Sequence, residues 1–219
     1  RNHCPSCAGF RIDAAYYDPL AKTVRHKLRQ LGGRRVAEFA RVLKPAGRYK
    51  TCYVDRDNGR PLLSGAQLLQ TSVINLQFMA PRVFKDITAY ELNAGWIAYP
   101  ADGRAEEELG TPAFITRDRA GWLASGHVGR VIPKPGVDAG WLFLALKTSH
   151  AQMQLKACAS GSVVDSTFPN DMEEVILPPP LDTDGRKVVQ LWEDFREAQA
   201  LEERASAMVD DALLHFGMQ

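Results

Sequence analysis

Cys4 and Cys7, with His3 beside them, have the spacing of half a zinc site or of a redox-active pair of thiols. A closed zinc site needs a second pair of ligands, and the other two cysteines, Cys52 and Cys158, stand alone and far apart. A redox pair normally lies inside a βαβ pattern, which does not follow here. We therefore expect Cys4 and Cys7 to be reduced thiols without a bound metal ion.

Two further groups have the residue types that catalysis requires. Ser125 stands two residues before His127, so a hydroxyl nucleophile lies near a general base, but the sequence offers no nucleophile elbow and no nearby carboxylate to orient the histidine. The glutamates at 106–108 follow a glycine-containing turn and are typical of a solvated loop. Phosphate loops, dinucleotide fingerprints and paired-histidine metal motifs are absent from the sequence as well. We therefore expect this chain alone to catalyse no reaction.

Charged residues are unevenly distributed along the 219-residue chain, whose formal net charge is only +1. Residues 1–60 hold 14 Lys and Arg against 5 Asp and Glu, whereas residues 151–219 hold 5 against 13. The basic part suits a polyanion if its cations share one face, because phosphate neutralisation depends on local charge. If the cations scatter, they only solvate the surface. The charge pattern is therefore compatible with nucleic-acid binding without requiring it.

Helices and short strands must position these residues. Two N-terminal helices are expected at 19–31 and 35–43, because a glycine pair ends the first and a Lys-Pro step ends the second. Stretches rich in β-forming residues, separated by Gly, Pro and Asp, predict strands at 49–54, 62–63, 95–99, 113–115, 121–123 and 128–132. A further helix is expected at 141–158, and the last strand pieces at 161–164 and 175–177. These elements predict the α+β class, with an irregular, curled β-sheet and flanking helices in one domain at 1–180.

A long helix is expected after the proline run 178–180, within residues 181–219. Its apolar residues recur at three- and four-residue steps and form a seam, made of Val188, Leu191, Phe195, Ala198, Ala205, Val209, Ala212 and Phe216. At about 1.5 Å per residue the helix would be roughly 45 Å long, too long for a domain of this size to bury. The seam therefore predicts a coiled coil with a partner helix, in which Glu202 would fix the register. The alternative is a surface helix that folds back on its own domain.

Residues 10–19, F-R-I-D-A-A-Y-Y-D-P, resemble the opening R-[LI]-D-A-x-Y-Y-D-P of the DNA-specificity subunits of type I restriction-modification systems. Further stretches resemble later motifs of this family and follow the family's order, at 61–68, 125–133, 140–146, 159–164 and 175–180. The long C-terminal helix is also a feature of the family. One departure concerns the family's T-R-x-G-x-x-G motif after the central strand, because residues 99–110 are Y-P-A-D-G-R-A-E-E-E-L-G instead.

The resemblance implies a DNA target-recognition domain that reads one half of a bipartite double-stranded site. It also implies a spacer helix that docks the modification (methyltransferase) subunit and pairs with a second such helix, from another specificity half or from a homodimer. A complete specificity subunit has two domains and two helices. This chain therefore resembles a half subunit, an excerpt, or the recognition module of a fused modification enzyme.

The resemblance and the sequence also give expectations about the cofactor, the location in the cell and an alternative function. The resemblance implies no cofactor on this chain, since S-adenosylmethionine would bind the partner methyltransferase. A cytoplasmic protein without a membrane partner is expected, because the sequence has neither an apolar run long enough to span a bilayer nor a signal peptide. The competing hypothesis is a protein-interaction scaffold or regulatory half-subunit that acts through the C-terminal helix without DNA readout. Salt-dependent binding to duplex DNA separates the two hypotheses.

Recognition of DNA uses side chains on loops, since Arg pairs with guanine, Gln or Asn pairs with adenine, and Lys, Ser and main-chain NH groups hold phosphates. The candidate DNA contacts are Arg48, Lys50, Ser64, Gln67, Arg104, Arg117, Arg119, His127 and Arg130, with Ser160 and Ser162 for phosphates. The sequence does not determine which bases they would read.

Overall fold

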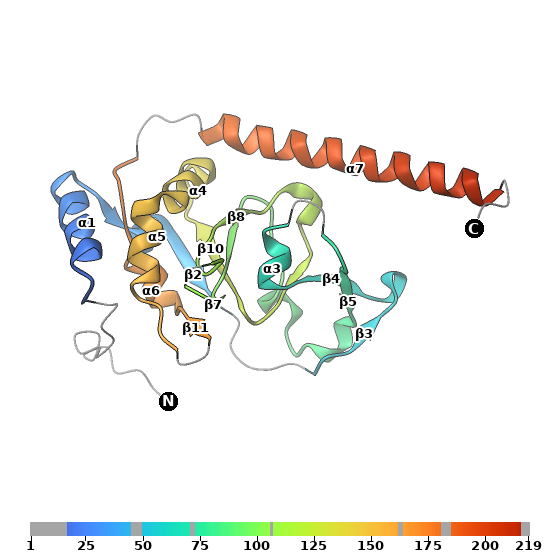
Figure 1. Cartoon of the computed structure of the whole chain (residues 1–219), viewed down its shortest axis with the longest axis horizontal. Coiled ribbons are helices and arrows are strands. Elements are labelled where there is room, and N and C mark those ends of the chain that lie inside the picture. The colour runs from blue at the N-terminus through green and yellow to red at the C-terminus, as the bar shows by residue number, and fades with distance from the viewer. Residues whose placement is uncertain are drawn as a thin grey trace.

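Figure 1 shows a domain of short strands and helices, with one long helix, α7, that runs across one side of it. The computed structural model describes residues 17–44, 50–70, 73–105, 107–161, 164–180 and 185–215. Its helices are α1 (Pro19–Gln30), α2 (Val36–Phe39), α3 (Gly65–Leu68), α4 (Ala139–Lys147), α5 (Ser149–Lys156), α6 (Pro169–Glu173) and α7 (Gly185–His215). Its 3₁₀ turns are η3 (Arg56–Asn58), η4 (Pro81–Val83), η5 (Ile87–Ala89) and η6 (Arg117–Arg119).

The described strands form two four-stranded sheets, ordered β2-β10-β6-β8 and β3-β5-β4-β9, and two ribbons, β1-β12 and β7-β11. Neighbouring strands pair antiparallel, except that β4 and β9 are parallel. The strands are β1 (Arg34–Arg35), β2 (Ala40–Leu43), β3 (Tyr53–Val54), β4 (Arg60–Leu63), β5 (Gln77–Met79), β6 (Ile97–Pro100), β7 (Asp102–Gly103), β8 (Ala113–Phe114), β9 (Leu123–Ala124), β10 (Val128–Pro133), β11 (Asp165–Ser166) and β12 (Ile176–Leu177). The α+β class expected from the sequence is therefore confirmed.

The first helix begins and ends where its sequence signals predict. Asp18 precedes it, and the Asp18 carboxylate accepts a hydrogen bond from the backbone nitrogen of Leu20 at 2.9 Å, which satisfies a free donor of the first turn. Gly32 follows the helix with a φ of +81°, a left-handed conformation that glycine adopts without steric cost. The prediction for residues 19–31 is therefore confirmed to within one residue.

Two other helix predictions are wrong in part. The second expected helix divides into the one-turn helix α2 and strand β2, because Ala40 and Val42 are buried in an extended segment that pairs with β10. Pairing with this strand outweighs the helical propensity of so short a segment. The helix expected at 141–158 is interrupted at Thr148, whose hydroxyl accepts a hydrogen bond from the backbone nitrogen of Ala151 at 3.3 Å and starts α5 as a separate helix.

Most of the predicted strands are present. The confirmed stretches, to within one or two residues at each end, are those expected at 62–63, 95–99, 113–115, 121–123, 128–132 and 175–177. Of the strand expected at 49–54, only Tyr53 and Val54 belong to a strand among the described residues. The strand piece expected at 161–164 is wrong in position, since β11 begins at Asp165, while residues 162 and 163 lie outside the described part of the chain.

The beginning of α7 contacts α4 through backbone atoms. A Cβ atom on Gly140 would lie 2.0 Å from the carbonyl oxygen of Gly185, and one on Gly185 would lie 2.6 Å from the backbone nitrogen of Trp141. Only glycine leaves room for this close approach. Val188 and Trp192, on the next turns of α7, pack against the main hydrophobic core, so the first part of the helix is anchored to the domain.

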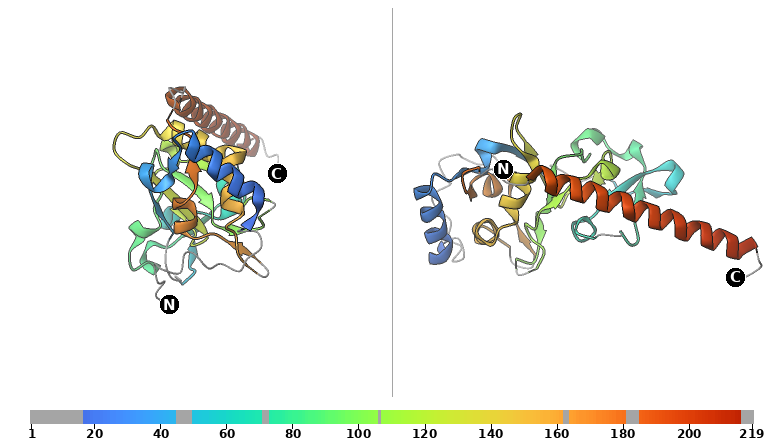
Figure 2. Two further views of the ribbon diagram at one scale, coloured as in Figure 1. Left: turned by 90° about the vertical axis from the view of Figure 1, so that its left-hand side faces the viewer. Right: turned by 90° about the horizontal axis from the view of Figure 1, so that it is seen from above.

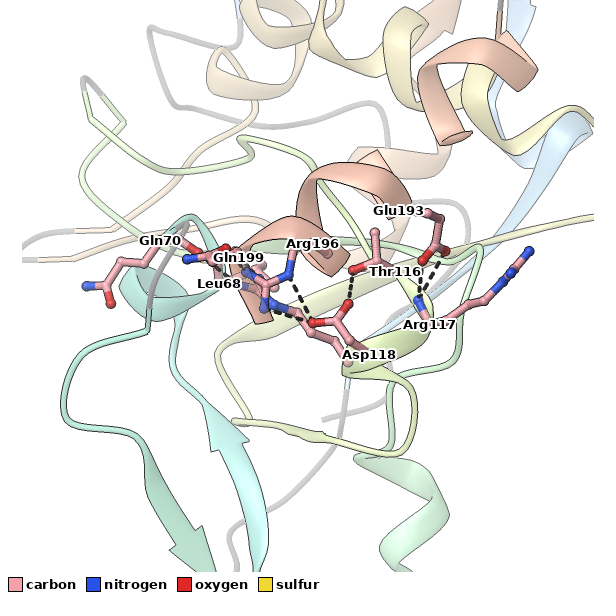
Figure 3. Close-up of polar contacts among 9 residues, drawn as sticks. Leu68, Gln70, Thr116, Arg117, Asp118, Glu193, Arg196 and Gln199 are labelled. Carbon is pink, nitrogen blue, oxygen red and sulfur yellow. Dashed lines mark hydrogen bonds and ion pairs between the residues drawn. The ribbon is translucent and has the colours of Figure 1, made fainter. Parts of the chain in front are cut away.

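A polar contact between α7 and η6, which we call the α7 contact, holds the helix further along (Figure 3). Arg196 donates from Nε and Nη2 to one carboxylate oxygen of Asp118, at 2.9 and 2.8 Å. The hydroxyl of Thr116 donates to the other oxygen at 2.6 Å, and the backbone nitrogen of Arg117 donates to the carboxylate of Glu193 at 3.1 Å. Because the side chains of Arg196 and Asp118 are only 13% and 32% exposed, this ion pair is largely shielded from water.

The pKa of Asp118 reflects this environment. Burial by itself raises the pKa, but the hydrogen bonds from Arg196 and Thr116, together with the positive charge of Arg196, outweigh burial and lower the pKa below the ordinary aspartate range. A carboxyl group whose pKa is lower in the folded state stabilises the fold above its unfolded pKa, and this contribution is lost as the pH falls through the folded pKa. The α7 contact therefore stabilises the fold at neutral pH and weakens in acid.

Replacing Asp118 with Asn should lower the free energy of unfolding at pH 7 by about 1–3 kcal/mol, because it removes the negative charge that faces the half-buried Arg196. The difference between the parent and the variant should shrink as the pH falls from about 4 through the lower folded pKa of Asp118, because the parent carboxylate then also becomes protonated. Urea unfolding at pH 7 and at a pH below about 4, followed by circular dichroism, measures the free energy of unfolding of the parent and of the variant.

Glu107→Gln is the matched control, since Glu107 forms an exposed ion pair with Arg104 and its loss should cost no more than about 0.5 kcal/mol. An Asp118→Asn effect of the same size at neutral and at acid pH would contradict a role for the ionised carboxylate.

Candidate nucleic-acid interface

Four of the candidate DNA contacts meet at one end of the first sheet. The backbone nitrogen of Ser125 donates to the carbonyl oxygen of Leu63 at 2.9 Å, which brings the turn that carries His127 next to Ser64. The backbone nitrogen of Ala101 donates to the carbonyl oxygen of His127 at 2.8 Å, and strand β7 and Arg104 follow directly.

Ser160 joins the same place through β11, because it forms a bridge with Ser166, which pairs with Asp102 of β7. We call this surface the β7 rim and define it by the residues Ser64, Asp102, Arg104, His127 and Ser160. In Figure 1 the ribbon β7-β11 lies on the side of the domain away from α7.

Asp102 is the centre of the rim's hydrogen bonding. One of its carboxylate oxygens accepts from Lys44 Nζ at 2.8 Å, and the other lies 2.6 Å from Nδ1 of His127. The Asp102 side chain is 16% exposed, whereas that of His127 is 72% exposed. Burial raises the pKa of Asp102, but hydrogen bonds from Lys44, Ser166 and His127 outweigh it and lower the pKa below the ordinary range. The carboxylate is therefore ionised at neutral pH.

The position of Asp102 corrects one expectation from the sequence. We expected no carboxylate near Ser125 and His127, but pairing of β6 with β10 brings Asp102, from 25 residues earlier in the chain, into contact with the imidazole. The arrangement is still not that of a nucleophile and its base. The hydrogen bond that joins Ser125 with His127 runs from the histidine backbone nitrogen to the serine hydroxyl at 3.4 Å.

Ser64 and Gln67 form a capping box at the beginning of α3. The Ser64 hydroxyl accepts from the backbone nitrogen of Gln67 at 3.3 Å, and the Gln67 side-chain oxygen accepts from the backbone nitrogen of Ser64 at 3.1 Å. The side-chain nitrogen of Gln67 donates to the carbonyl oxygens of Ile74 and Asn75, at 3.0 and 3.1 Å. Ser64 remains exposed at the rim, whereas the Gln67 amide is engaged in holding the following loop.

Two candidate arginines are buried, which argues against their assignment as DNA contacts. Arg119 is 5% exposed and donates to the carbonyl oxygens of Leu68 and Gln70, at 3.3 and 2.8 Å. Burial, and then the charge of Arg196, lower the pKa of Arg119 to about 10. Arg130 is 2% exposed, donates to the carbonyl oxygen of Glu91 at 3.2 Å, and has its pKa lowered by burial. Both guanidinium groups satisfy backbone carbonyl groups inside the domain and cannot reach a groove in this conformation.

The remaining candidates differ in position. Arg117 is exposed but lies beside α7, and Figure 3 shows its guanidinium group pointing away from the α7 contact. Lys50 is exposed just before β3. Arg48 and Ser162 lie outside the described residues, as do Cys4 and Cys7. Within the ranges that the structure describes, no group of three or more His, Cys, Asp or Glu side chains could hold a metal ion.

The basic N-terminal third is partly neutralised in the structure. Arg35 pairs with Glu174 at 2.8 Å, and Arg34 lies 3.9 Å from Glu38. Arg25 donates to the carbonyl oxygen of Gln154 at 3.1 Å. Arg25 and Arg35 therefore help to attach α1 and β1 to the rest of the domain. On helix α1, the lysines and arginines that remain exposed are Lys22, Lys27 and Arg29.

The predicted seam of α7 divides into two faces. Val188 packs against the domain together with Trp192, so the alternative of a helix lying on its own domain holds for this part. Leu191, Ala198, Ala205, Val209 and Ala212 are exposed, and Phe195 is 46% exposed. Phe216 lies outside the described residues. Leu201, Met208 and Leu213 add to the exposed group, which we call the outward face.

The second half of α7 extends past the domain (Figure 2). All of its described side chains from Leu201 to Leu213 are exposed. At about 100° per residue, Leu201, Ala205 and Ala212 lie roughly opposite to Trp192, whereas Phe195 and Leu213 lie at the edge of the outward face nearest to Trp192. The expectation that the domain alone cannot bury this helix is therefore confirmed.

The comparisons with known proteins find similar structures but no similar sequences. No family model matches the chain, and no curated protein matches it. Among the described residues, none of the helices combines the length and the hydropathy that a membrane span requires.

Three solved structures are similar over most of the chain. One comes from a study of complex assembly and conformational transition of the type I restriction-modification system. It is 16% identical to this chain with a TM-score of 0.50, and the match covers 94% of this chain and 51% of the length of that structure's chain. The HsdS subunit from Thermoanaerobacter tengcongensis is 15% identical, with a TM-score of 0.49, over 94% of this chain and 50% of its own. The type IIG restriction endonuclease BpuSI is 13% identical, with a TM-score of 0.57, over 85% of this chain and 28% of its own.

This chain therefore spans about half the length of the type I structures that it matches. The identities are low, so the likeness concerns the course of the backbone and not the site residues. The chain has the α+β fold that occurs in a type I restriction-modification system and in a type IIG restriction endonuclease.

Proposed function

We propose that this chain is a DNA-specificity module of a restriction-modification system and reads one half of a bipartite double-stranded site. The observation that carries the proposal is the β7 rim, where backbone pairing brings Ser64, Arg104, His127 and Ser160 together. The fold supports it, since a type I restriction-modification structure matches 94% of the chain.

The rim has the side chains that groove recognition needs. Arg104 is exposed and has the planar donors that pair with guanine, while the exposed imidazole of His127 suits a base edge. Ser64 and Ser160 suit phosphate oxygens, which fix the position of the protein without reading sequence. Lys50, exposed at the start of the second sheet, adds a phosphate contact. The buried Arg119 and Arg130 keep the supporting loops in place.

The outward face of α7 is the proposed assembly surface. A row of exposed apolar side chains on a helix that leaves its domain suits pairing with a second helix, from another specificity half or from a second copy of this chain. The modification (methyltransferase) subunit would dock on the same pair. This partner, rather than this chain, would hold S-adenosylmethionine and carry out the chemistry. The module itself would be non-catalytic.

DNA binding should weaken steeply with salt. If six or more phosphates are neutralised, the affinity for duplex DNA should fall by about a thousandfold or more between roughly 50 and 200 mM salt, because bound protein releases condensed counterions. Filter binding or fluorescence anisotropy with a randomised duplex library, with the methyltransferase partner present, measures this. Absent or salt-insensitive binding would favour the alternative, a protein-interaction scaffold or regulatory half-subunit acting through α7.

Substitutions at the rim should separate base contacts from phosphate contacts. Arg104→Ala should cost about 1–3 kcal/mol of binding free energy on the preferred half-site and little on other sequences, whereas Lys50→Ala should weaken binding to all duplexes alike. Arg117→Ala removes another exposed arginine, on the α7 side, and is the matched control, expected to leave binding unchanged if the rim is the DNA surface. Equal effects of Arg104→Ala and Arg117→Ala would exclude the rim as the DNA surface.

The outward face of α7 should determine assembly. Replacing Leu201 and Val209 with Asp should weaken association by at least about 3 kcal/mol, because it puts charges where apolar side chains would be buried. Ala207→Asp, which adds a charge on another side of the helix, should leave association intact. Light scattering with and without the methyltransferase measures this, and a parent chain that is monomeric under both conditions would contradict the proposal.

A further inference from the structure

We infer that Asp102 is a positioning residue, which places the proton of His127 on Nδ1 so that Nε2 meets DNA as a hydrogen-bond acceptor for a base amino group. The inference rests on the DNA-reading function proposed above. It names one specificity contact and the chemical group that this contact recognises.

The geometry determines which nitrogen of His127 carries the proton. Asp102 is ionised, and an ionised carboxylate has acceptors only. One oxygen accepts from Lys44 Nζ at 2.8 Å, and the other lies 2.6 Å from Nδ1 of His127. A carboxylate oxygen and an unprotonated ring nitrogen are both acceptors and would repel each other, so a contact this short requires the proton on Nδ1. This holds whether the imidazole is neutral or charged. Nε2 is then the free nitrogen of a neutral ring.

The surroundings of Asp102 make it a firm support for an exposed ring. Its side chain is 16% exposed and that of Lys44 is 17% exposed, so their charges compensate each other in a largely buried place. Strand β7, which carries Asp102, pairs with Asp165 and Ser166 of β11. The His127 side chain, by contrast, is 72% exposed. The interior end of the contact is therefore held in place, and the imidazole is the part that meets solvent.

The location of the proton determines what His127 can recognise. A neutral imidazole with its proton on Nδ1 has only an acceptor at Nε2. Phosphate oxygens are acceptors too, so this form of the ring cannot bind a phosphate. The donors that DNA offers are amino groups, on adenine N6 and cytosine N4 in the major groove and on guanine N2 in the minor groove. In this neutral form His127 suits a base amino group, in contrast to Ser64 and Ser160, which suit phosphate oxygens at the same rim.

The proton location can be measured on the free protein. Nitrogen-15 NMR of the imidazoles at about pH 8.5, with the His127→Gln variant to identify the signals, should find His127 as the Nδ1-protonated form, whereas histidines in water favour the Nε2-protonated form. In Asp102→Asn, the side-chain oxygen remains for Lys44 and the new NH₂ group faces His127, so the proton should move to Nε2. An Nε2-protonated His127 in the parent protein would overturn the inference, even if the variant did not fold.

The recognised group can be measured on DNA. The preferred duplex is selected from a randomised library with the methyltransferase present, and each base is then replaced singly by an analogue without its amino group. Binding by the parent should fall by about 5- to 150-fold at one position, and His127→Ala should show no further loss at that position.

The two proposals fail in different ways. Absence of any duplex binding by the parent would overturn the proposed function, whatever the NMR result. Binding that is insensitive to every amino-group deletion, or an equal loss in the parent and in His127→Ala, would overturn the role of His127 alone. Asp102→Asn should weaken discrimination at the same position, and unchanged discrimination with a moved proton would also contradict the inference.

Discussion

The structure depends on the position of β10 between β2 and β6. Its residues Val128, Gly129, Arg130 and Val131 are buried, so neither side of this part of the strand faces water. Antiparallel pairing on both edges determines which residues lie together, and a shift by one residue would exchange the two sides of the strand. The turn before β10 carries His127 to the rim. The chain after it leads through Lys134 to α4 and hence to the anchor of α7.

The elements that the sequence predicts best are those with local causes. Asp18 and Gly32 delimit α1 through capping and a left-handed turn, and both signals act within a few residues. One error arises where a distant strand determines the structure of a segment, and another where a cap inside an expected helix starts a new helix. Residues 40–43 become a strand because β10 pairs with them, and the helix expected from Trp141 onward divides because the Thr148 hydroxyl caps a new helix.

The residues of the site were also predictable only in part, because their types can be read from the sequence but their burial and their contacts depend on strand pairing. Residue type and the family motifs indicated His127, Arg104, Ser64 and Ser160, and the structure brings these four together. Burial separates them from Arg119 and Arg130, and no pattern in the sequence distinguishes a buried arginine from an exposed one. Asp102 was missed as a partner of His127, because only the pairing of β6 with β10 brings them into contact.

The attachment of α7 by only its first half has a mechanical consequence. Backbone contact at Gly185, apolar packing at Trp192 and the ion pair of Arg196 fix the helix from its first turn to Arg196, while the turns from Leu201 onward project from the domain. Helix and domain therefore form one stiff body in which the projecting half is a lever arm. A partner that held this arm would set the direction in which the β7 rim, the proposed recognition surface, faces.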